Sequence, residues 1–284
     1  MSFQEYLHSF RFGKRFIYTL SIDALLFAII TIMFFTFSQL LKARANAISG
    51  GRSPEELKAA LLTGSIENSQ AFLSHVKIFA LVMIFGFILV IVATLLLISL
   101  SRSMVWHHLF AQPFSRKKYW RWNLMTLLLG GFAVIFVLLY ALVRVLVNIL
   151  LPLRNDTMYA LMVQFLNGLF FISFLFVAGS IYYSFVQRYT VFESVGQGFS
   201  LLKLRWSKVW RVFFLVLLTG TVISFMTYYL QKTFLLYQPP WLNAVIGIII
   251  LLLFLSWLRL YLFTTLHGSH SLHQERPPHP ESNP

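Results

Sequence analysis

Long apolar stretches alternate with short polar segments along the whole chain. Six of these stretches hold few charged residues, and they are apolar at every position rather than at every second one. A helix crosses a hydrocarbon core of roughly 30 Å with about 20 apolar residues, whereas a transmembrane strand would alternate in polarity. The pattern therefore predicts an all-α, polytopic membrane protein. Its six transmembrane helices are expected at about residues 16–41, 78–101, 122–150, 158–186, 210–231 and 241–263.

The six helices are expected to form a single membrane domain, residues 1–263. The segment that follows, 264–284, contains four of the eight histidines together with several prolines. Such a tail could chelate a metal, but a disordered cytoplasmic tail that contains histidine is the simpler interpretation. We therefore expect no metal site.

Composition agrees with the membrane interpretation. The chain is 58% hydrophobic and 11% charged, with a mean hydropathy of +0.74, whereas soluble domains are about 25% charged. A water-soluble globular protein is therefore excluded. The chain has no cysteine, which excludes disulfides, thiolate catalysis and cysteine-ligated metals.

Lysine and arginine predict the orientation, because they favour the cytoplasmic side of short loops. With the N-terminus inside, fifteen of the 23 lysines and arginines lie in inner segments and seven in outer ones, while Arg144 lies within a helix. We expect a protein of the cell (plasma) membrane with both termini in the cytoplasm. The first apolar stretch exceeds a signal-peptide core of about 7–15 residues, so it is expected to be a retained helix.

The segment FSRKKYWRWN, residues 114–123, combines four cations with aromatic residues at the predicted inner end of the third helix. Aromatic rings collect at headgroup level and cations attract anionic lipid. We interpret it as a membrane interface, with membrane lipids as partners and no nucleic acid. The residues expected to contact lipid headgroups on the cytoplasmic side are Arg116, Lys117, Lys118, Trp120, Arg121, Trp122, Lys203, Arg205, Trp206, Lys208, Trp210 and Arg211.

Apolar residues recur at steps of three and four between Tyr189 and Phe213, which predicts an amphipathic helix in the interface plane. The segments WRWNLMTLLLGG (120–131) and WRVFFLVLLTG (210–220) also align. The chain could therefore consist of three hairpin repeats. Alternatively, any six-helix protein with a basic, aromatic inner surface would show this likeness.

The order Glu193-Ser194, GFSLLKLRW (198–206) and WRVFFLVLL (210–218) after a returning helix carries a resemblance. It resembles the six-helix membrane domain attached to some glycerophosphoryl diester phosphodiesterases, and related multi-pass membrane proteins. The resemblance implies a membrane domain of undetermined activity. The catalytic barrel of those enzymes has no counterpart in this chain, so their activity is not implied.

The sequence offers little support for an enzyme. Metalloprotease, serine-hydrolase and phosphate-loop motifs are absent. Asp23 is the one acidic residue within a predicted helix, and a single carboxylate cannot supply both a general acid and a general base. We expect no catalytic residue and no cofactor.

Polar residues inside membrane helices are costly and are therefore candidates for function. Arg144 and Asn148 on the third helix should lie at the depth of Gln164 and Asn167 on the fourth, and these four could bind an anionic solute or headgroup. The alternative is that Arg144 extends outward to the membrane surface while the amides join helices. On the inner side, Asp23 and Arg259 are expected to form an ion pair that joins the first helix to the sixth.

Two classes of function remain open. A non-enzymatic module would bind lipid or a protein partner, which could be a second copy of the chain. A small transporter or permease for an anionic solute or lipid would have its site near Arg144. Transporter sites often lie at helices broken by glycine or proline. Glycines occur in these helices, whereas prolines lie only at an edge, so we favour the module.

Overall fold

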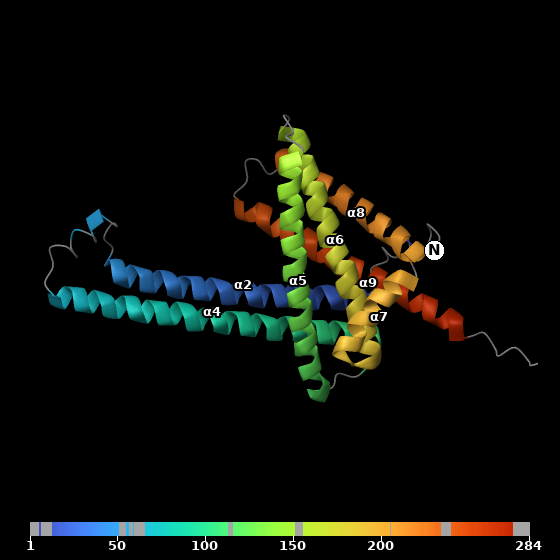
Figure 1. Cartoon of the computed structure of the whole chain (residues 1–284), viewed down its shortest axis with the longest axis horizontal. Coiled ribbons are helices and arrows are strands. Elements are labelled where there is room, and N and C mark those ends of the chain that lie inside the picture. Colours follow the sequence, from blue (N-terminus) through green and yellow to red (C-terminus); the bar gives the residue numbers. More distant parts are fainter. Residues whose placement is uncertain are drawn as a thin grey trace, which may run out of the picture. The chain divides into compact units, whose positions relative to one another are not determined.

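A computed structural model of the chain describes residue 6 and residues 13–50, 55–56, 59, 66–112, 116–150, 156–204, 206–233 and 240–274. The elements within these ranges are α2 (Lys14–Ser49), α4 (Ile66–Leu109), α5 (Arg116–Leu150), α6 (Asp156–Arg188), α7 (Val191–Leu204), α8 (Trp206–Thr233) and α9 (Pro240–Gln274), as Figure 1 shows. All of these helices except α7 contain a segment long and apolar enough to cross a membrane. The predicted all-α class with six spanning helices is confirmed.

Several helices extend beyond the predicted spans. α4 starts well before residue 78, and α9 continues to Gln274 instead of ending at 263. The chain has no proline between Pro240 and Pro277, so no residue type in this stretch is strongly incompatible with a helix. The first part of the segment expected to be a disordered tail is therefore helical, while residues 275–284 lie outside the described residues.

The chain divides into two compact units, and both boundaries fall inside long helices. The second unit, Ala24–Ser101, contains most of α2 and the larger part of α4. Within it the two helices approach closely at Gly86, where an added side chain would overlap the ring of Phe37. Large apolar side chains on both helices are exposed, which suits helices surrounded by lipid.

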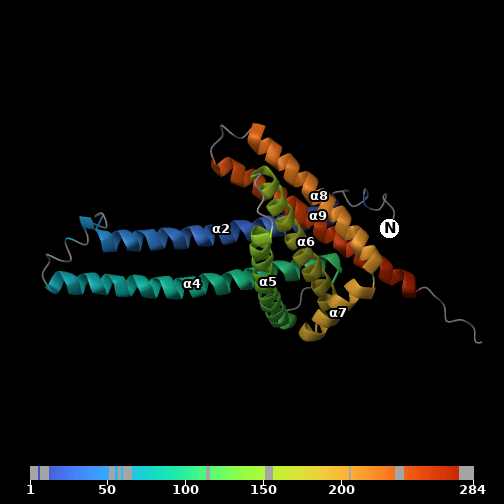
Figure 2. The same cartoon turned by 45° about the horizontal axis from the view of Figure 1, so that its top comes forward.

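The first unit contains α5 to α9 with the ends of α2 and α4, and α6 is its central element. In the apolar segment of α6, 56% of the residues are buried, against 11% for α5 and 17% for α8. Figures 1 and 2 show α8 and α9 running alongside α6. On another side α5 packs through aromatic pairs, with ring centroids 5.6 Å apart for Phe136 and Phe174. The first unit has two clusters of buried apolar residues, and α6 contributes residues to both.

The turn between α6 and α7 is formed by two local features. Tyr189 adopts a left-handed conformation, with φ of 55°, and its amide donates a hydrogen bond to the carbonyl of Phe185 at 2.7 Å. Thr190 then begins α7, because its backbone carbonyl accepts a hydrogen bond from the amide of Ser194 at 3.1 Å, and its hydroxyl donates to the Glu193 carboxylate at 3.0 Å. The predicted amphipathic helix between Tyr189 and Phe213 is thus divided into α7 and the start of α8.

α7 packs against α6 through its smallest side chains. Val191, Ser194 and Gly198 are buried, whereas Phe192 and Phe199 are exposed. These buried positions recur at helical spacing, so they form one face. Phe192 and Phe199 of the predicted stripe therefore point away from α6, where they can contact lipid.

Candidate functional site

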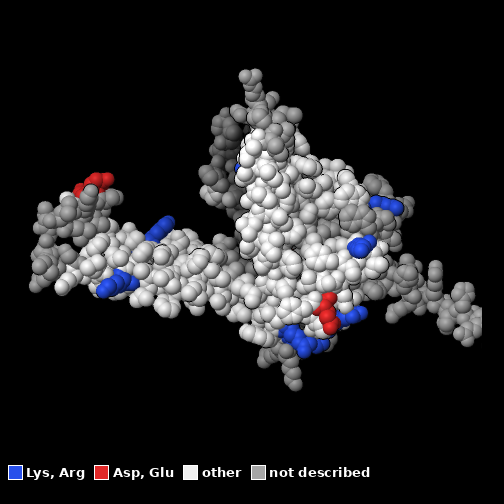
Figure 3. All heavy atoms as spheres, viewed as in Figure 1, with Lys and Arg blue, Asp and Glu red and all other residues white. Residues whose placement is uncertain are grey.

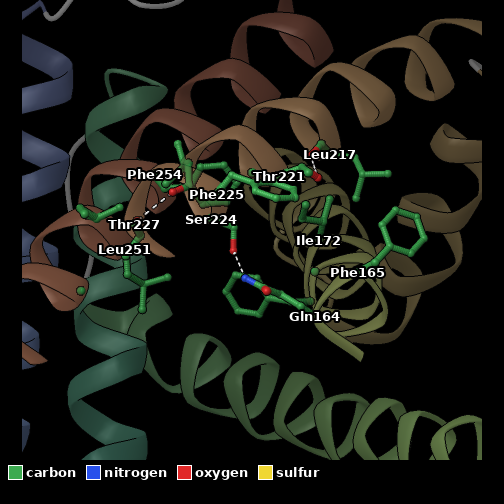
Figure 4. A pocket seen from close by; sticks show the side chains of 16 residues that line it. Gln164, Phe165, Ile172, Leu217, Thr221, Ser224, Phe225, Thr227, Leu251 and Phe254 are labelled. Atoms are coloured by element: carbon green, nitrogen blue, oxygen red, sulfur yellow. Dashed lines mark hydrogen bonds between the residues drawn. The ribbon is translucent and has the colours of Figure 1, made fainter. Parts of the chain in front are cut away.

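A cavity of about 530 Å³ lies between α6, α8 and α9 in the first unit, and Figure 4 shows it from close by. Each helix contributes one glycine to its wall: Gly168, Gly220 and Gly247. An added Cβ atom at Gly168 or Gly247 would meet nothing within 4 Å. The cavity therefore exists in part because side chains are missing at these two positions, whereas an added Cβ atom at Gly220 would lie 3.3 Å from Cδ1 of Ile172.

The remaining wall of the cavity is apolar with few polar groups. Gln164 donates a hydrogen bond from Nε2 to the hydroxyl of Ser224 at 2.7 Å, which the dashed line in Figure 4 marks. Thr221 and Thr227 each donate their hydroxyl to a carbonyl of their own helix at 2.8 Å. None of the described residues that line the cavity is charged. Such a wall favours an apolar ligand over a charged one.

A second hollow of about 350 Å³ lies on α8 and α9 and shares part of this wall. Its lining includes Met226, Leu230 and Trp257. Both hollows are lined by Ile223, Thr227, Ile250 and Phe254. The two hollows thus form neighbouring parts of one apolar surface along the α8–α9 pair.

Two of the polar residues predicted to form an anion site, Asn148 and Asn167, lie between α5 and α6. The Asn148 side-chain oxygen accepts a hydrogen bond from Tyr159 at 2.9 Å, and that of Asn167 accepts one from Tyr140. These two pairs fix an antiparallel alignment that places Arg144 level with residue 163, next to Gln164. Arg144 and Gln164 are therefore level with each other along the α5–α6 pair.

These four residues do not converge on one site. The amides of Asn148 and Asn167 join α5 to α6, and Gln164 instead joins α6 to α8. Arg144 is exposed and forms no ion pair with any described residue. The arrangement matches the alternative in which amides join helices, and the sequence did not indicate the tyrosine and serine partners.

Asp23 and Arg259 come together, and a residue that the sequence analysis did not single out joins them. Oδ2 of Asp23 lies 3.0 Å from Nη1 of Arg259. Arg102 donates a hydrogen bond from Nη1 to Oδ1 of Asp23 at 3.1 Å. The exposed fractions of the side chains are 4% for Asp23, 12% for Arg259 and 21% for Arg102, so the cluster is largely buried.

A second polar cluster joins the end of α4 to the end of α6. Nδ1 of His107 lies 2.7 Å from the carbonyl of Ser103, which can only accept, so Nδ1 carries the proton. The Tyr189 hydroxyl lies 2.9 Å from Nε2 of His107 and 3.2 Å from Oε1 of Gln112, and it can donate to either. Burial raises the pKa of Tyr189 above its ordinary value, so this hydroxyl stays protonated at neutral pH.

Two cations of the FSRKKYWRWN segment contact the same tyrosine. Nζ of Lys118 lies 3.9 Å from the centre of the Tyr189 ring. Arg121 donates a hydrogen bond from Nη1 to the backbone carbonyl of Tyr189 at 3.2 Å, which satisfies an acceptor just beyond the end of α6. These cations therefore also fix the turn between α6 and α7.

The predicted lipid-headgroup interface needs one correction. Trp120 is 76% exposed, but Trp122 is fully buried, and its ring stacks on that of Tyr182 with centroids 5.8 Å apart. The physical reason is helical geometry, because positions two apart lie on nearly opposite faces. Trp122 is therefore a core residue.

Other residues of this predicted interface are exposed where the structure describes them. Figure 3 shows that described charges gather near helix ends, with uncharged surface between them. Lys118, Arg121, Lys203, Trp210 and Arg211 are exposed. The side chains of Arg116, Lys117, Arg205, Trp206 and Lys208 lie outside the described residues.

The helices and their surfaces define the class of protein. Six helices long and apolar enough to cross a membrane, with large apolar side chains exposed on their outer faces, make the chain a multi-pass helical membrane protein. Comparison with protein-family models, curated proteins and solved structures finds no match.

Proposed function

We propose that the protein is a non-enzymatic membrane module that binds a lipid, with an acyl chain in the cavity between α6, α8 and α9. The observation that carries this proposal is the convergence of Gly168, Gly220 and Gly247 on one apolar cavity. Its volume, about 530 Å³, lies within the roughly 300–1,000 Å³ of small-molecule sites. In the membrane, acyl chains are the most abundant apolar ligands of this shape.

The chemistry of the wall favours lipid over an anionic solute. A charge in this cavity would lose its hydration and find only an amide and hydroxyls, and the two threonine hydroxyls already donate within their helices. The transporter alternative placed its site near Arg144, where Asn148 and Asn167 are already engaged by tyrosines. We therefore place the ligand at the cavity.

The location of the protein belongs to the same proposal. The distribution of lysine and arginine supports a plasma-membrane protein with both termini in the cytoplasm. The end of the first unit that carries Lys118, Arg121 and Lys203 would then face anionic headgroups. A protein partner, or a second copy of the chain, remains compatible with lipid binding.

Filling the cavity tests the proposal. Gly247→Leu introduces a side chain into free space in the cavity wall. Gly131→Leu is the matched control, because a Cβ atom there also meets nothing within 4 Å and the residue does not line the cavity. Native mass spectrometry of gently extracted protein would measure the retained lipid. We expect Gly247→Leu to lose lipid that Gly131→Leu keeps, and equal retention in the two variants would contradict the proposal.

A further inference from the structure

The cluster of Asp23, Arg102 and Arg259 contains more positive than negative charge. Its single carboxylate contacts both guanidinium groups, one at each oxygen. No other acidic side chain of the described residues forms an ion pair with either arginine. One positive charge in the cluster is therefore not neutralised, and such a charge is costly in the membrane interior.

The arginines also have hydrogen-bond donors to spare. Each guanidinium carries five N–H groups, and each approaches the carboxylate through a single terminal nitrogen rather than as a two-pronged fork. Nη1 of Arg259 is buried and forms no well-aligned hydrogen bond with any described residue. Ser256, which is fully buried, precedes Arg259 by three residues on α9, so both residues lie on the same face of that helix.

Two more unused donors lie in the same part of the first unit. The rings of Trp106 and Trp122 flank Tyr182, with centroids 6.2 Å and 5.8 Å from its ring. Trp106 follows Arg102 by four residues on α4, so these two residues lie on the same face of the helix. The exposed fraction is 1% for Trp106 and 0% for Trp122. Neither indole nitrogen bonds to a described residue. An indole N–H can only donate, so these groups lack an acceptor.

We propose that Arg102 and Arg259 form a binding site for a phosphate-type oxyanion, with the buried indole N–H groups of Trp106 and Trp122 as additional donors. A phosphate group supplies what this region lacks, which is negative charge and several acceptor oxygens, and its geometry matches the planar guanidinium fork. Asp23 then holds the two arginines in place and lowers the positive charge without cancelling it.

The depth of the cluster suits the phosphate of a lipid headgroup. Arg102 precedes the end of α4 at Leu109 by seven residues, which is about 10 Å at 1.5 Å per residue. A free phosphate ion from the cytoplasm would offer the same chemistry. The site is separate from the acyl-chain cavity, because Arg259 and the cavity residue Ile250 lie nine positions apart and therefore on opposite faces of α9. Failure of one proposal would leave the other intact.

The unmodified protein provides the first test. Its melting temperature in detergent would be measured with inorganic phosphate and with chloride at equal ionic strength, then with phosphatidylglycerol and with phosphatidylcholine. Stabilisation by inorganic phosphate would support the site with a soluble ion, and stabilisation by phosphatidylglycerol alone would support it with a lipid headgroup. No stabilisation beyond that of chloride and phosphatidylcholine would overturn the proposal.

Charge variants provide the second test, with retention of phosphatidylglycerol in native mass spectrometry as the readout. Arg102→Gln should weaken retention about tenfold or more, the value of one charge-assisted hydrogen bond. Arg44→Gln is the matched control, because it removes the same charge from an exposed residue of α2 that belongs to neither the cluster nor the predicted headgroup interface. Equal retention in these two variants would contradict the site.

Two milder variants separate anion binding from a purely structural role. Asp23→Asn removes the competing negative charge, so retention should rise, whereas a purely structural cluster would give no gain. Trp122→Phe keeps the aromatic ring and removes its N–H, so retention should fall a few-fold. Unchanged retention in both variants would overturn the proposal even if Arg102→Gln failed to fold.

Discussion

Arg102 donates a hydrogen bond to the carboxylate of Asp23 across 79 positions of sequence, at 3.1 Å. The same carboxylate also contacts Arg259. A cluster of three charges responds to mutation differently from the simple Asp23–Arg259 pair that the sequence predicts. Removing the carboxylate leaves two buried arginines unpaired, and removing one arginine leaves the other in place.

The first prediction follows from this third member. Asp23→Arg should reduce folded protein strongly, because unpaired buried charges cost about 3–5 kcal/mol. The reversed pair Asp23→Arg with Arg259→Asp should recover little, since the new arginine then faces Arg102. Adding Arg102→Asp inverts all three charges and should recover more. Size-exclusion chromatography in detergent would measure the amount of folded protein for each variant. Full recovery by the reversed pair alone would show that Arg102 contributes nothing to the cluster.

The second prediction concerns the contact between α7 and α6. An added Cβ atom at Gly198 would lie 3.0 Å from the Cα atom and amide nitrogen of Ile181, and backbone atoms cannot move aside easily. Gly198→Ala should therefore destabilise the protein by roughly 1–3 kcal/mol. Gly196→Ala is the control, because nothing lies within 4 Å of its added Cβ atom, and alanine there should stabilise α7 by about 0.5–1 kcal/mol.

Thermal unfolding and hydrogen exchange of the α7 amides measure the two glycine variants. We expect faster exchange across α7 in Gly198→Ala and unchanged or slower exchange in Gly196→Ala. If both variants behave alike, the close approach at Ile181 does not hold α7 in place.

The third prediction concerns the hydroxyl of Tyr189. Tyr189→Phe removes the hydroxyl that bonds to Nε2 of His107 or to Oε1 of Gln112, at a cost of about 0.5–1.5 kcal/mol. The raised pKa of Tyr189 means that the folded state keeps this proton where the unfolded state loses it. Stability of the unmodified protein should therefore fall as pH rises above about 10. Denaturant unfolding at pH 8 and above pH 10 would measure the free energy of unfolding of the unmodified protein and of Tyr189→Phe. We expect the difference between them to be smaller above pH 10 than at pH 8. Equal free energies of unfolding at pH 8 would contradict the prediction.

The fourth prediction is the topology. Positive residues gather in the segments expected inside, so reporter fusions after Lys118 and Arg205 should read cytoplasmic. Fusions at Gly51 and Lys232 should read external. A cytoplasmic signal at Gly51 would reverse the expected orientation.

The sequence was sufficient to predict the helices, but it did not show which face of each helix is buried. A run of apolar residues needs no knowledge of neighbours to be recognised as a membrane helix. Trp120 and Trp122 look equivalent in such a run, yet one is exposed and the other buried. The difference arises from the packing of α5 against α6, which the sequence pattern alone does not specify. The sequence analysis did not place the start of α7, although Thr190-Val191-Phe192-Glu193 has the spacing of a capping box.

The sites depended still more on tertiary structure. Asp23 was identifiable as a buried charge in need of a partner, and Arg259 was a reasonable choice, but Arg102 lay outside the predicted span and gave no signal. The cavity could not be predicted, because Gly168, Gly220 and Gly247 lie on three helices and meet only through packing. The predicted three-hairpin repeat and the family resemblance remain predictions.

Photocrosslinking with a lipid tests the central claim most directly. A phospholipid with a diazirine on its acyl chain would be incorporated into membranes containing the protein, and the labelled residues identified by mass spectrometry. We predict concentrated labelling of cavity residues such as Phe225, Ile250 and Leu251, and loss of that labelling in Gly247→Leu. Phe85 and Leu89 of α4 are 67% and 70% exposed and serve as the comparison. If they are labelled as strongly as the cavity residues, labelling merely follows exposure, and a lipid site between α6, α8 and α9 is contradicted.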